Sequence, residues 1–226
     1  EKTQNGTLLP GTSGIGHTRW ATHGAPTDTN AHPHMSADGK FAIVHNGIIE
    51  NYAALRDELK SKGFVFRSET DTEVIVHLLD MYYTGDLKAA VLHTAARLEG
   101  SYALGVLCAD QPGTICAVKM ASPLILGVGV GENFFASDVT ALVSHTKNVI
   151  YLEDGEFAEI TPDSISIYDS TGAPVHRSIS RIVWDIEAAE KGGYEHFMLK
   201  EIMEQPRALK ATIAPRIKNG KIVLDD

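Results

Sequence analysis

The chain has 226 residues, of which 43% are hydrophobic and 22% charged, as in ordinary globular domains. Its formal net charge of −9 argues against a nucleic-acid partner, because nucleic-acid-binding domains concentrate Lys and Arg on their surfaces. No apolar run approaches the roughly 18 residues of a membrane span, and no apolar signal segment follows Glu1. We therefore expect a cytoplasmic protein without a membrane partner.

The first hundred residues combine strand-like and helical patterns. Runs with polar residues at their ends predict strands at 14–22, 40–48 and 65–69. Apolar side chains at helical spacing predict helices at 51–63, 70–83 and 86–98. Several helices beside many strands indicate a fold of packed helix and sheet layers.

Beyond Gly100 the apolar runs become short and are separated by Gly and Pro. They predict sheet strands at 101–110, 114–122, 124–131 and 133–137, with hairpin turns at 154–155 and 171–172. Such tight turns favour antiparallel pairing. Helices are predicted at 139–146, 184–190 and 195–213, and Pro206 should end or kink the last of them.

Five of the ten histidines lie between residues 17 and 45, and three interpretations compete for them. They could bind zinc, although a proline separates the rings of "HPH" and no third ligand is evident. They could satisfy buried carbonyl groups at strand ends. They could also belong to a site for an amide or carboxylate substrate, since the Arg19 guanidinium matches a carboxylate and Trp20 could wall a pocket.

Two other short segments each carry a structural and a functional interpretation. Asn46 and Gly47 could form a hairpin turn, or their side-chain amide and backbone N–H could stabilise an oxyanion. In "SETDTEV", Thr70 and Glu73 have capping-box spacing and Asp71 could cap the helix. Alternatively, Asp71 could accept a substrate ammonium group.

Four ordered motifs, "GHTRWATHG", "NAHPH", "VHNGIIEN" and "SETDTEV", resemble the glutaminase domains of glucosamine-6-phosphate synthases, also called glutamine–fructose-6-phosphate aminotransferases (isomerizing). The resemblance covers nearly the whole chain and is closer than that to amidophosphoribosyltransferase or asparagine synthetase, which remain the alternative. It implies an α+β fold of the N-terminal-nucleophile hydrolase type, in which two antiparallel sheets are sandwiched between helix layers.

The same resemblance implies roles for individual residues. Arg19 would bind the α-carboxylate of L-glutamine and Asp71 its α-amine, while Asn46 and Gly47 would form the oxyanion hole. The pocket would be lined by Trp20, Thr22 and His23. His32 matches a recurring family position and is expected to support the site. The implied mechanism needs neither a metal nor another cofactor.

The family nucleophile is an N-terminal cysteine, and this sequence begins instead at Glu1. The two cysteines, Cys108 and Cys116, flank a predicted turn and are expected to be buried, reduced thiols, which are poor nucleophiles. We therefore expect the fold to lack its N-terminal segment and the chain alone to be inactive. A non-catalytic glutamine-binding module and a metallohydrolase are the rivals from other functional classes.

The resemblance also predicts how the chain is divided. Residues 1–205 would form the N-terminally incomplete glutaminase domain, and residues 206–226 would link it to an absent sugar-phosphate isomerase domain that binds fructose 6-phosphate. The intact protein is expected to be a homodimer. The ammonia released from glutamine would convert fructose 6-phosphate to glucosamine 6-phosphate.

Overall fold

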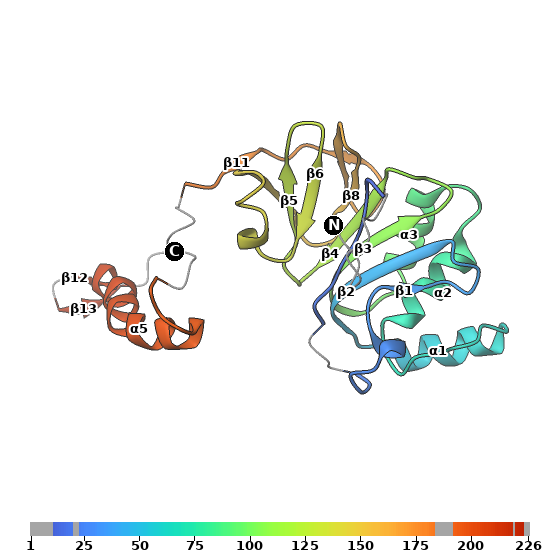
Figure 1. Cartoon of the computed structure of the whole chain (residues 1–226), viewed down its shortest axis with the longest axis horizontal. Helices are drawn as coiled ribbons and strands as arrows, with labels where there is room; N and C mark the ends of the chain where they lie inside the picture. Colours follow the sequence, from blue (N-terminus) through green and yellow to red (C-terminus); the bar gives the residue numbers. More distant parts are fainter. Residues whose placement is uncertain (1–10, 20–22, 184–191, 219, 224–226) are drawn as a thin grey trace. The chain divides into compact units, whose positions relative to one another are not determined.

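The computed structural model describes residues 11–19, 23–183, 192–218 and 220–223. Contacts between Cα atoms divide the chain into two compact units, Glu1–Ile182 and Val183–Asp226, which are described separately (Figure 1). None of the helices in these described stretches is long and apolar enough to cross a membrane.

A seven-stranded antiparallel sheet forms the centre of the first unit, and its strands follow the order β1-β2-β3-β4-β8-β9-β10. These strands are β1 (His34–Met35), β2 (Phe41–Ile49), β3 (Gly100–Cys108), β4 (Ile115–Met120), β8 (Phe157–Ile160), β9 (Ile165–Tyr168) and β10 (Pro174–Val175). The longest pairing joins β2 to β3 over nine residue pairs, from Phe41 opposite Cys108 to Ile49 opposite Gly100.

A second antiparallel sheet has the order β11-β7-β5-β6. Its strands are β5 (Ile125–Val128), β6 (Asn133–Ala136), β7 (Asn148–Tyr151) and β11 (Ser180–Arg181). Neighbouring residues of one strand enter different cores, because successive side chains point to opposite faces. Leu126 packs in the core between the two sheets, whereas Ile125 packs on the outer face of this smaller sheet.

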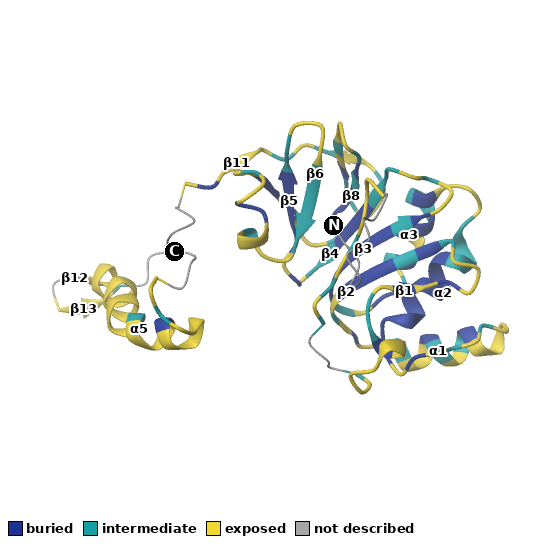
Figure 2. Cartoon of the chain, viewed as in Figure 1, coloured by how far each residue is buried: buried dark blue, intermediate teal, exposed yellow. Residues whose placement is uncertain are grey.

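Three helices cover the other face of the seven-stranded sheet, namely α1 (Tyr52–Ser61), α2 (Glu73–Tyr82) and α3 (Leu87–Ala95). They enclose the largest hydrophobic cluster, in which Phe41, Ile43 and Leu104 of the sheet meet Ile75 and Leu78 of α2. Burial is nearly complete along α2 (Figure 2). The outer face of the smaller sheet packs against the short 3₁₀ helix η2 (Val139–Ala141) and the residues that follow it.

The layers therefore run from helices through two antiparallel sheets to a thin helical layer, and the predicted α+β sandwich is confirmed. Three separate clusters of buried side chains fill the spaces between these layers. Burial of apolar surface stabilises a folded domain by roughly 25 cal/mol for each Å² removed from water.

Several predicted elements differ in the structure. Residues 14–19 and 65–69 form no strand, because their backbone groups bond to side chains: Arg19 N–H to His17 Nδ1, and Ser68 N–H to Glu73 Oε2. The segment at 139–146 contains only the 3₁₀ helix η2. The turn at 154–155 links β7 and β8, which belong to different sheets, so no hairpin forms there.

Other predictions at the level of elements hold. The hairpin around 171–172 is present as the antiparallel pair β9 and β10. Cys108 and Cys116 are free and buried, as expected from the sequence. The helix predicted at 184–190 lies outside the described residues.

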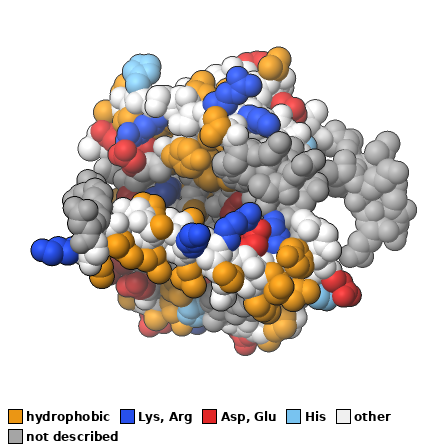
Figure 3. Space-filling view, turned by 90° about the vertical axis from the view of Figure 1, so that its left-hand side faces the viewer, with side chains coloured by type: hydrophobic (Ala, Val, Ile, Leu, Met, Phe, Trp, Pro, Cys, Tyr) orange, Lys and Arg blue, Asp and Glu red, His pale blue; other side chains and the backbone are white. Residues whose placement is uncertain are grey.

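The second unit contains a 17-residue helix, α5 (Phe197–Ile213), followed by the 3₁₀ helix η3 (Ala214–Arg216) and the two-stranded sheet of β12 (Ile217–Lys218) and β13 (Lys221–Ile222). Pro206 lies inside α5 and does not end it. The helix thus runs across the predicted domain boundary at residue 205, which stays a prediction. Apolar side chains of α5 such as Met198 and Leu209 are exposed, and Figure 3 shows hydrophobic, basic and acidic side chains at the surface in that view.

Candidate active site

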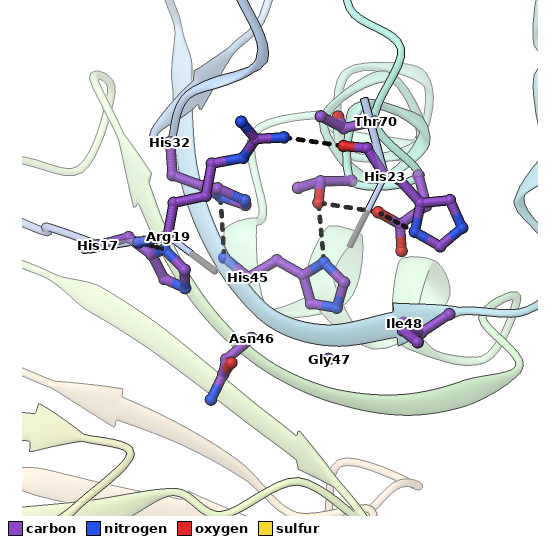
Figure 4. Close-up of a pocket in the computed structure, with 11 residues that line it drawn as sticks. His17, Arg19, His23, His32, His45, Asn46, Gly47, Ile48 and Thr70 are labelled. Atoms are coloured by element: carbon purple, nitrogen blue, oxygen red, sulfur yellow. Dashed lines mark hydrogen bonds and ion pairs between the residues drawn. The ribbon is translucent and has the colours of Figure 1, made fainter. Parts of the chain in front are cut away.

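One cavity of about 330 Å³ brings together residues from all four predicted motifs (Figure 4). Its lining is made by His17, Arg19, His23, His32, His45, Asn46, Gly47, Ile48, Thr70, Asp71 and Thr72. The predicted residues Trp20 and Thr22 lie outside the described residues. All the other residues predicted for the site line this single cavity.

The free edge of β2 forms one wall of the cavity. Strand β1 pairs with β2 only through Ala42 and Ile43, so the later residues of β2 have no neighbouring strand on this side among the described residues. Side chains take the place of that strand: His32 Nδ1 accepts the N–H of His45 at 3.3 Å, and Asp71 Oδ2 accepts the N–H of Ile49 at 2.8 Å.

Gly47 lies between these two bonded residues on the same edge. Alternate residues of an antiparallel strand direct their N–H groups to the same side, so the N–H of Gly47 faces the cavity with those of His45 and Ile49. Among the described residues it has no acceptor. A free N–H at this position is suited to bind a carbonyl oxygen or an oxyanion.

The alternative of a hairpin turn at Asn46 and Gly47 is wrong, because both residues lie within β2 opposite Ala103 and Tyr102 of β3. Gly47 has a φ of 131°, and a Cβ there would overlap the backbone carbonyl of Ser101. The exposed Asn46 amide points to the opposite face of β2 from the His45 imidazole (Figure 4). The cavity therefore reaches around the edge of the strand.

Asp71 is buried, with only 3% of its surface exposed. In addition to the bond from Ile49, its Oδ1 lies 3.5 Å from Thr72 Oγ1 and 3.8 Å from His23 Nδ1. It makes no cap on α2, whose N-cap residue is Thr72, and Thr72 makes no side-chain capping bond. A carboxylate offers about four acceptor positions, so Asp71 retains capacity for a further donor.

Arg19 has an unusual backbone with a φ of 48°. Its Nη2 donates to the carbonyl oxygens of His23 at 2.8 Å and Gly24 at 3.1 Å, and its Nη1 donates to that of Ala25 at 3.1 Å. A guanidinium has five N–H donors, so donors remain for a ligand carboxylate. The guanidinium therefore both holds the 23–25 loop and faces the cavity.

Four imidazoles form a contiguous cluster, and those of His17, His32 and His45 line the cavity. The ring of His32 lies 4.5 Å from that of His17, 5.0 Å from that of His34 and 6.4 Å from that of His45. Burial, reinforced by the neighbouring cations, lowers the pKa of His32 to about 3, and burial lowers that of His45 to about 4. These two rings are therefore uncharged at neutral pH.

Imidazoles of this cluster also hold the segment that carries Asp71. His45 Nδ1 bonds Thr72 Oγ1 at 2.8 Å, and His34 Nε2 bonds Thr70 Oγ1 at 3.1 Å. Thr70 and Thr72 were not predicted as site residues, because the "TDT" sequence was interpreted as part of a helix cap. Within the described part of the chain, no three His, Cys, Asp or Glu side chains are placed to bind a metal ion.

Neither cysteine belongs to the cavity. Cys108 lies at the end of β3 and Cys116 in β4, and both pack in the core between the seven-stranded sheet and the helices. Burial raises the pKa of Cys116 far above its ordinary value, which suppresses the thiolate form. The cavity thus has groups that could bind and polarise a substrate, and the two thiols of the chain lie elsewhere.

The structure is thus a two-sheet α+β sandwich with one polar cavity lined by residues that include Arg19, Asp71 and Gly47. The family model for the glutamine amidotransferase domain matches residues 3–209, so the chain belongs to that family.

Curated relatives named glutamine–fructose-6-phosphate aminotransferase [isomerizing] are similar over most of the chain. The protein from Caldanaerobacter subterraneus subsp. tengcongensis is 55% identical over 96% of the chain, that from Aquifex aeolicus 56% over 89%, and that from Pyrococcus horikoshii 51% over 96%. The matches span 36%, 34% and 37% of these proteins, so the chain corresponds to about a third of their length.

The fold is also similar to a solved glutamine phosphoribosylpyrophosphate amidotransferase from B. subtilis, complexed with ADP and GMP. That match has a TM-score of 0.58 and 25% identity, and it covers 68% of this chain and 34% of the other. A second structure, described as the allosteric regulatory enzyme of purine biosynthesis, matches with a TM-score of 0.53 and 25% identity over 63% of this chain and 31% of the other.

Proposed function

We propose that the chain binds L-glutamine as the glutaminase part of an amidotransferase that releases glutamate and ammonia. The observation that carries the proposal is the single cavity shared by Arg19, Asp71 and the Asn46–Gly47 segment. Arg19 binds the α-carboxylate and Asp71 the α-ammonium, and the N–H of Gly47 and the amide of Asn46 stabilise the oxyanion. Loss of one oxyanion donor costs about 3 kcal/mol of transition-state stabilisation.

The spacing along β2 supports this orientation of the ligand. Asp71 is bonded at Ile49, and the free N–H belongs to Gly47, two residues earlier on the same edge. Two residues of a strand span about 7 Å, comparable to the distance between the amine and the side-chain amide of an extended glutamine. One ligand can therefore reach both groups while lying along the strand.

The attacking thiolate is proposed to come from a cysteine outside these 226 residues, since Cys108 and Cys116 lie away from the cavity. Its own α-amine, with an ordinary pKa near 8, would serve as the base. On this proposal the 226 residues alone bind glutamine without hydrolysing it.

The acceptor of the ammonia is proposed to be fructose 6-phosphate, which would become glucosamine 6-phosphate. Support comes from the names of the relatives that are 51–56% identical, compared with 25% for the phosphoribosylpyrophosphate enzyme. Because the chain corresponds to about a third of those relatives, the sugar-phosphate site is proposed to lie outside it, beyond the linker expected at 206–226. The homodimeric state and cytoplasmic location stay predictions.

Titration calorimetry of the 226-residue chain with L-glutamine tests the proposal. We expect binding by the wild type and a loss of about tenfold or more in affinity for Asp71→Asn, because the ammonium loses a charged acceptor. Asp80→Asn, on α2 and outside the cavity lining, is the matched control and should bind as the wild type does. Equal affinity of Asp71→Asn and the wild type, or no binding by the wild type, would contradict the proposal.

A further inference from the structure

Asn30 is a buried polar residue with only 3% of its surface exposed, and the glutamine-binding proposal gives it no role. It ends the 3₁₀ helix η1 (Asp28–Asn30) and does not line the cavity. Its side-chain amide makes three hydrogen bonds. Nδ2 donates to the carbonyl oxygen of Ala25 at 3.0 Å and to Glu69 Oε2 at 3.2 Å, and Oδ1 accepts the N–H of Glu69 at 2.9 Å.

These partners belong to two different segments that each adjoin residues of the cavity wall. The carbonyl oxygen of Ala25 also accepts a bond from Arg19 Nη1, so the Asn30 amide and the guanidinium meet at one atom. In the other segment, Glu69 precedes Thr70 and Asp71, which line the cavity. One buried amide thus connects the segment that holds the guanidinium to the segment that carries the carboxylate.

Close packing leaves this amide little freedom to move. Gly24 has a φ of 74°, and a Cβ there would lie 2.6 Å from Asn30 Nδ2 and 3.1 Å from Glu69 Cβ. The loop at 23–25 therefore fits against the amide only because residue 24 has no side chain. A planar group that donates to one segment and accepts from the other sets the distance between them through hydrogen bonds of fixed direction.

We infer that Asn30 is a positioning residue that fixes the separation of the Arg19 guanidinium from the Asp71 carboxylate, and thereby selects ligands carrying both a carboxylate and an ammonium group. The inference rests on the proposed function. A ligand with both groups gains from the two charges only if they lie at the correct separation. A ligand without the ammonium group needs only one of the two charges and is less sensitive to that separation.

Two ligands separate this role from a general effect on folding. L-Glutamine carries the ammonium group, whereas glutaramate has the same chain and amide without it. Calorimetric Kd values for both are measured on the 226-residue chain. In the wild type we expect glutamine to bind at least about tenfold more tightly than glutaramate, the value of a charged hydrogen bond.

Asn30→Ala removes all three hydrogen bonds, and we expect the ratio of the two Kd values to fall to about threefold or less. Asn30→Asp preserves the shape of the side chain and keeps the acceptor for the Glu69 N–H. It replaces the N–H₂ donor to the Ala25 carbonyl with an acceptor oxygen, so it should also lower the ratio of the two Kd values. The matched control is Asn133→Ala, because Asn133 likewise joins two backbone groups, Gly129 N–H and Thr161 O, outside this cavity.

The outcomes distinguish the inference from the function on which it rests. If the wild type fails to bind glutamine, both are overturned. If the wild type prefers glutamine but the Asn30 variants weaken both ligands equally, Asn30 is merely structural and the inference alone fails. Circular dichroism confirms folding of each variant, and Asn30→Asp decides the question if Asn30→Ala is unfolded. Unfolding of both variants would also count against a positioning role.

Discussion

Gly47 shows how one position can meet a structural and a chemical demand together. Its backbone has a φ of 131°, which side chains disfavour, and the place of a Cβ is taken by the Ser101 carbonyl group. From the same position its N–H faces the cavity at the edge of β2. A larger residue would therefore affect both the strand pairing and the site.

We expect Gly47→Ala to lower the free energy of unfolding by more than about 2 kcal/mol, because unfavourable φ and steric overlap add. Gly113→Ala is the matched control, since Gly113 has a φ of 84° but a Cβ there meets no atom within 4 Å. That control should lose about 1 kcal/mol. Urea denaturation measures both, and equal losses would show that the overlap with Ser101 is relieved at little cost.

His32, which lines the cavity, makes the free energy of unfolding depend on pH. Burial lowers its pKa to about 3 in the folded protein, compared with 6.5 for an ordinary histidine. As pH falls below 6.5, the unfolded chain takes up a proton that folded His32 does not accept until about pH 3. The unfolded state then binds more protons, and the free energy of unfolding decreases through this range.

Urea denaturation at about pH 7 and about pH 5 tests this linkage. We expect the wild type to be less stable at the lower pH and His32→Gln to show a smaller difference between the two conditions. The exposed His176→Gln controls for the removal of any imidazole. A pH difference that is the same in His32→Gln and the wild type would show that this ring does not cause the loss.

At the level of elements, helix α2 begins in an uncommon way. The side chain of its N-cap residue, Thr72, bonds His45 and makes no capping bond, and the Glu73 carboxylate reaches backward instead. Oε1 accepts the N–H of Arg67 at 2.7 Å, and Oε2 accepts the N–H and Oγ–H of Ser68 at 2.7 and 2.6 Å. Burial alone would raise the pKa of Glu73, but nearby His77 and these hydrogen bonds lower it to about 2.

Glu73→Gln should therefore lower the free energy of unfolding by about 2 kcal/mol, because an amide N–H₂ would face backbone donors. For comparison, Asp86 is an ordinary N-cap of α3 that accepts the N–H of Ala89 at 3.0 Å, and Asp86→Ala should cost about 1 kcal/mol. Chemical denaturation of both variants checks the order. A smaller loss for Glu73→Gln would mean that these bonds contribute less than a simple cap.

For the whole molecule, the relation between the two compact units is the main question. All residues that line the cavity, and all three hydrophobic clusters, belong to the unit Glu1–Ile182. The second unit contributes none of the described cavity residues. The described part of the site is thus built within one of the two units.

We expect a polypeptide of residues 1–182 to keep the fold and to bind L-glutamine within about threefold of the full chain, a change below 1 kcal/mol. A polypeptide of residues 1–205, ending at the predicted domain boundary, is the comparison. Calorimetry and circular dichroism measure both. Binding by residues 1–205 but not by 1–182 would support the predicted boundary and show that residues 183–205 complete the site.

Much of the architecture could be predicted locally. Helices α1 to α3 were expected at nearly their observed positions, because their apolar side chains recur at helical spacing and need no distant partner. The strand predicted at 65–69 is wrong, although the composition of the segment is strand-like. Its backbone N–H groups donate to the Glu73 carboxylate, which lies six residues beyond Arg67. The hairpin predicted at 154–155 is wrong for a related reason, because the strands on either side of the turn, β7 and β8, belong to different sheets.

By itself, the sequence indicated packed helix and sheet layers through the periodicity of its apolar residues, and the family and the candidate site residues through the resemblance of four ordered motifs. Only the folded chain directed the Gly47 N–H to a free strand edge and connected the Arg19 and Asp71 segments through Asn30. Those features depend on strand register and on contacts between residues distant in sequence. No local pattern encodes which backbone groups remain without a partner.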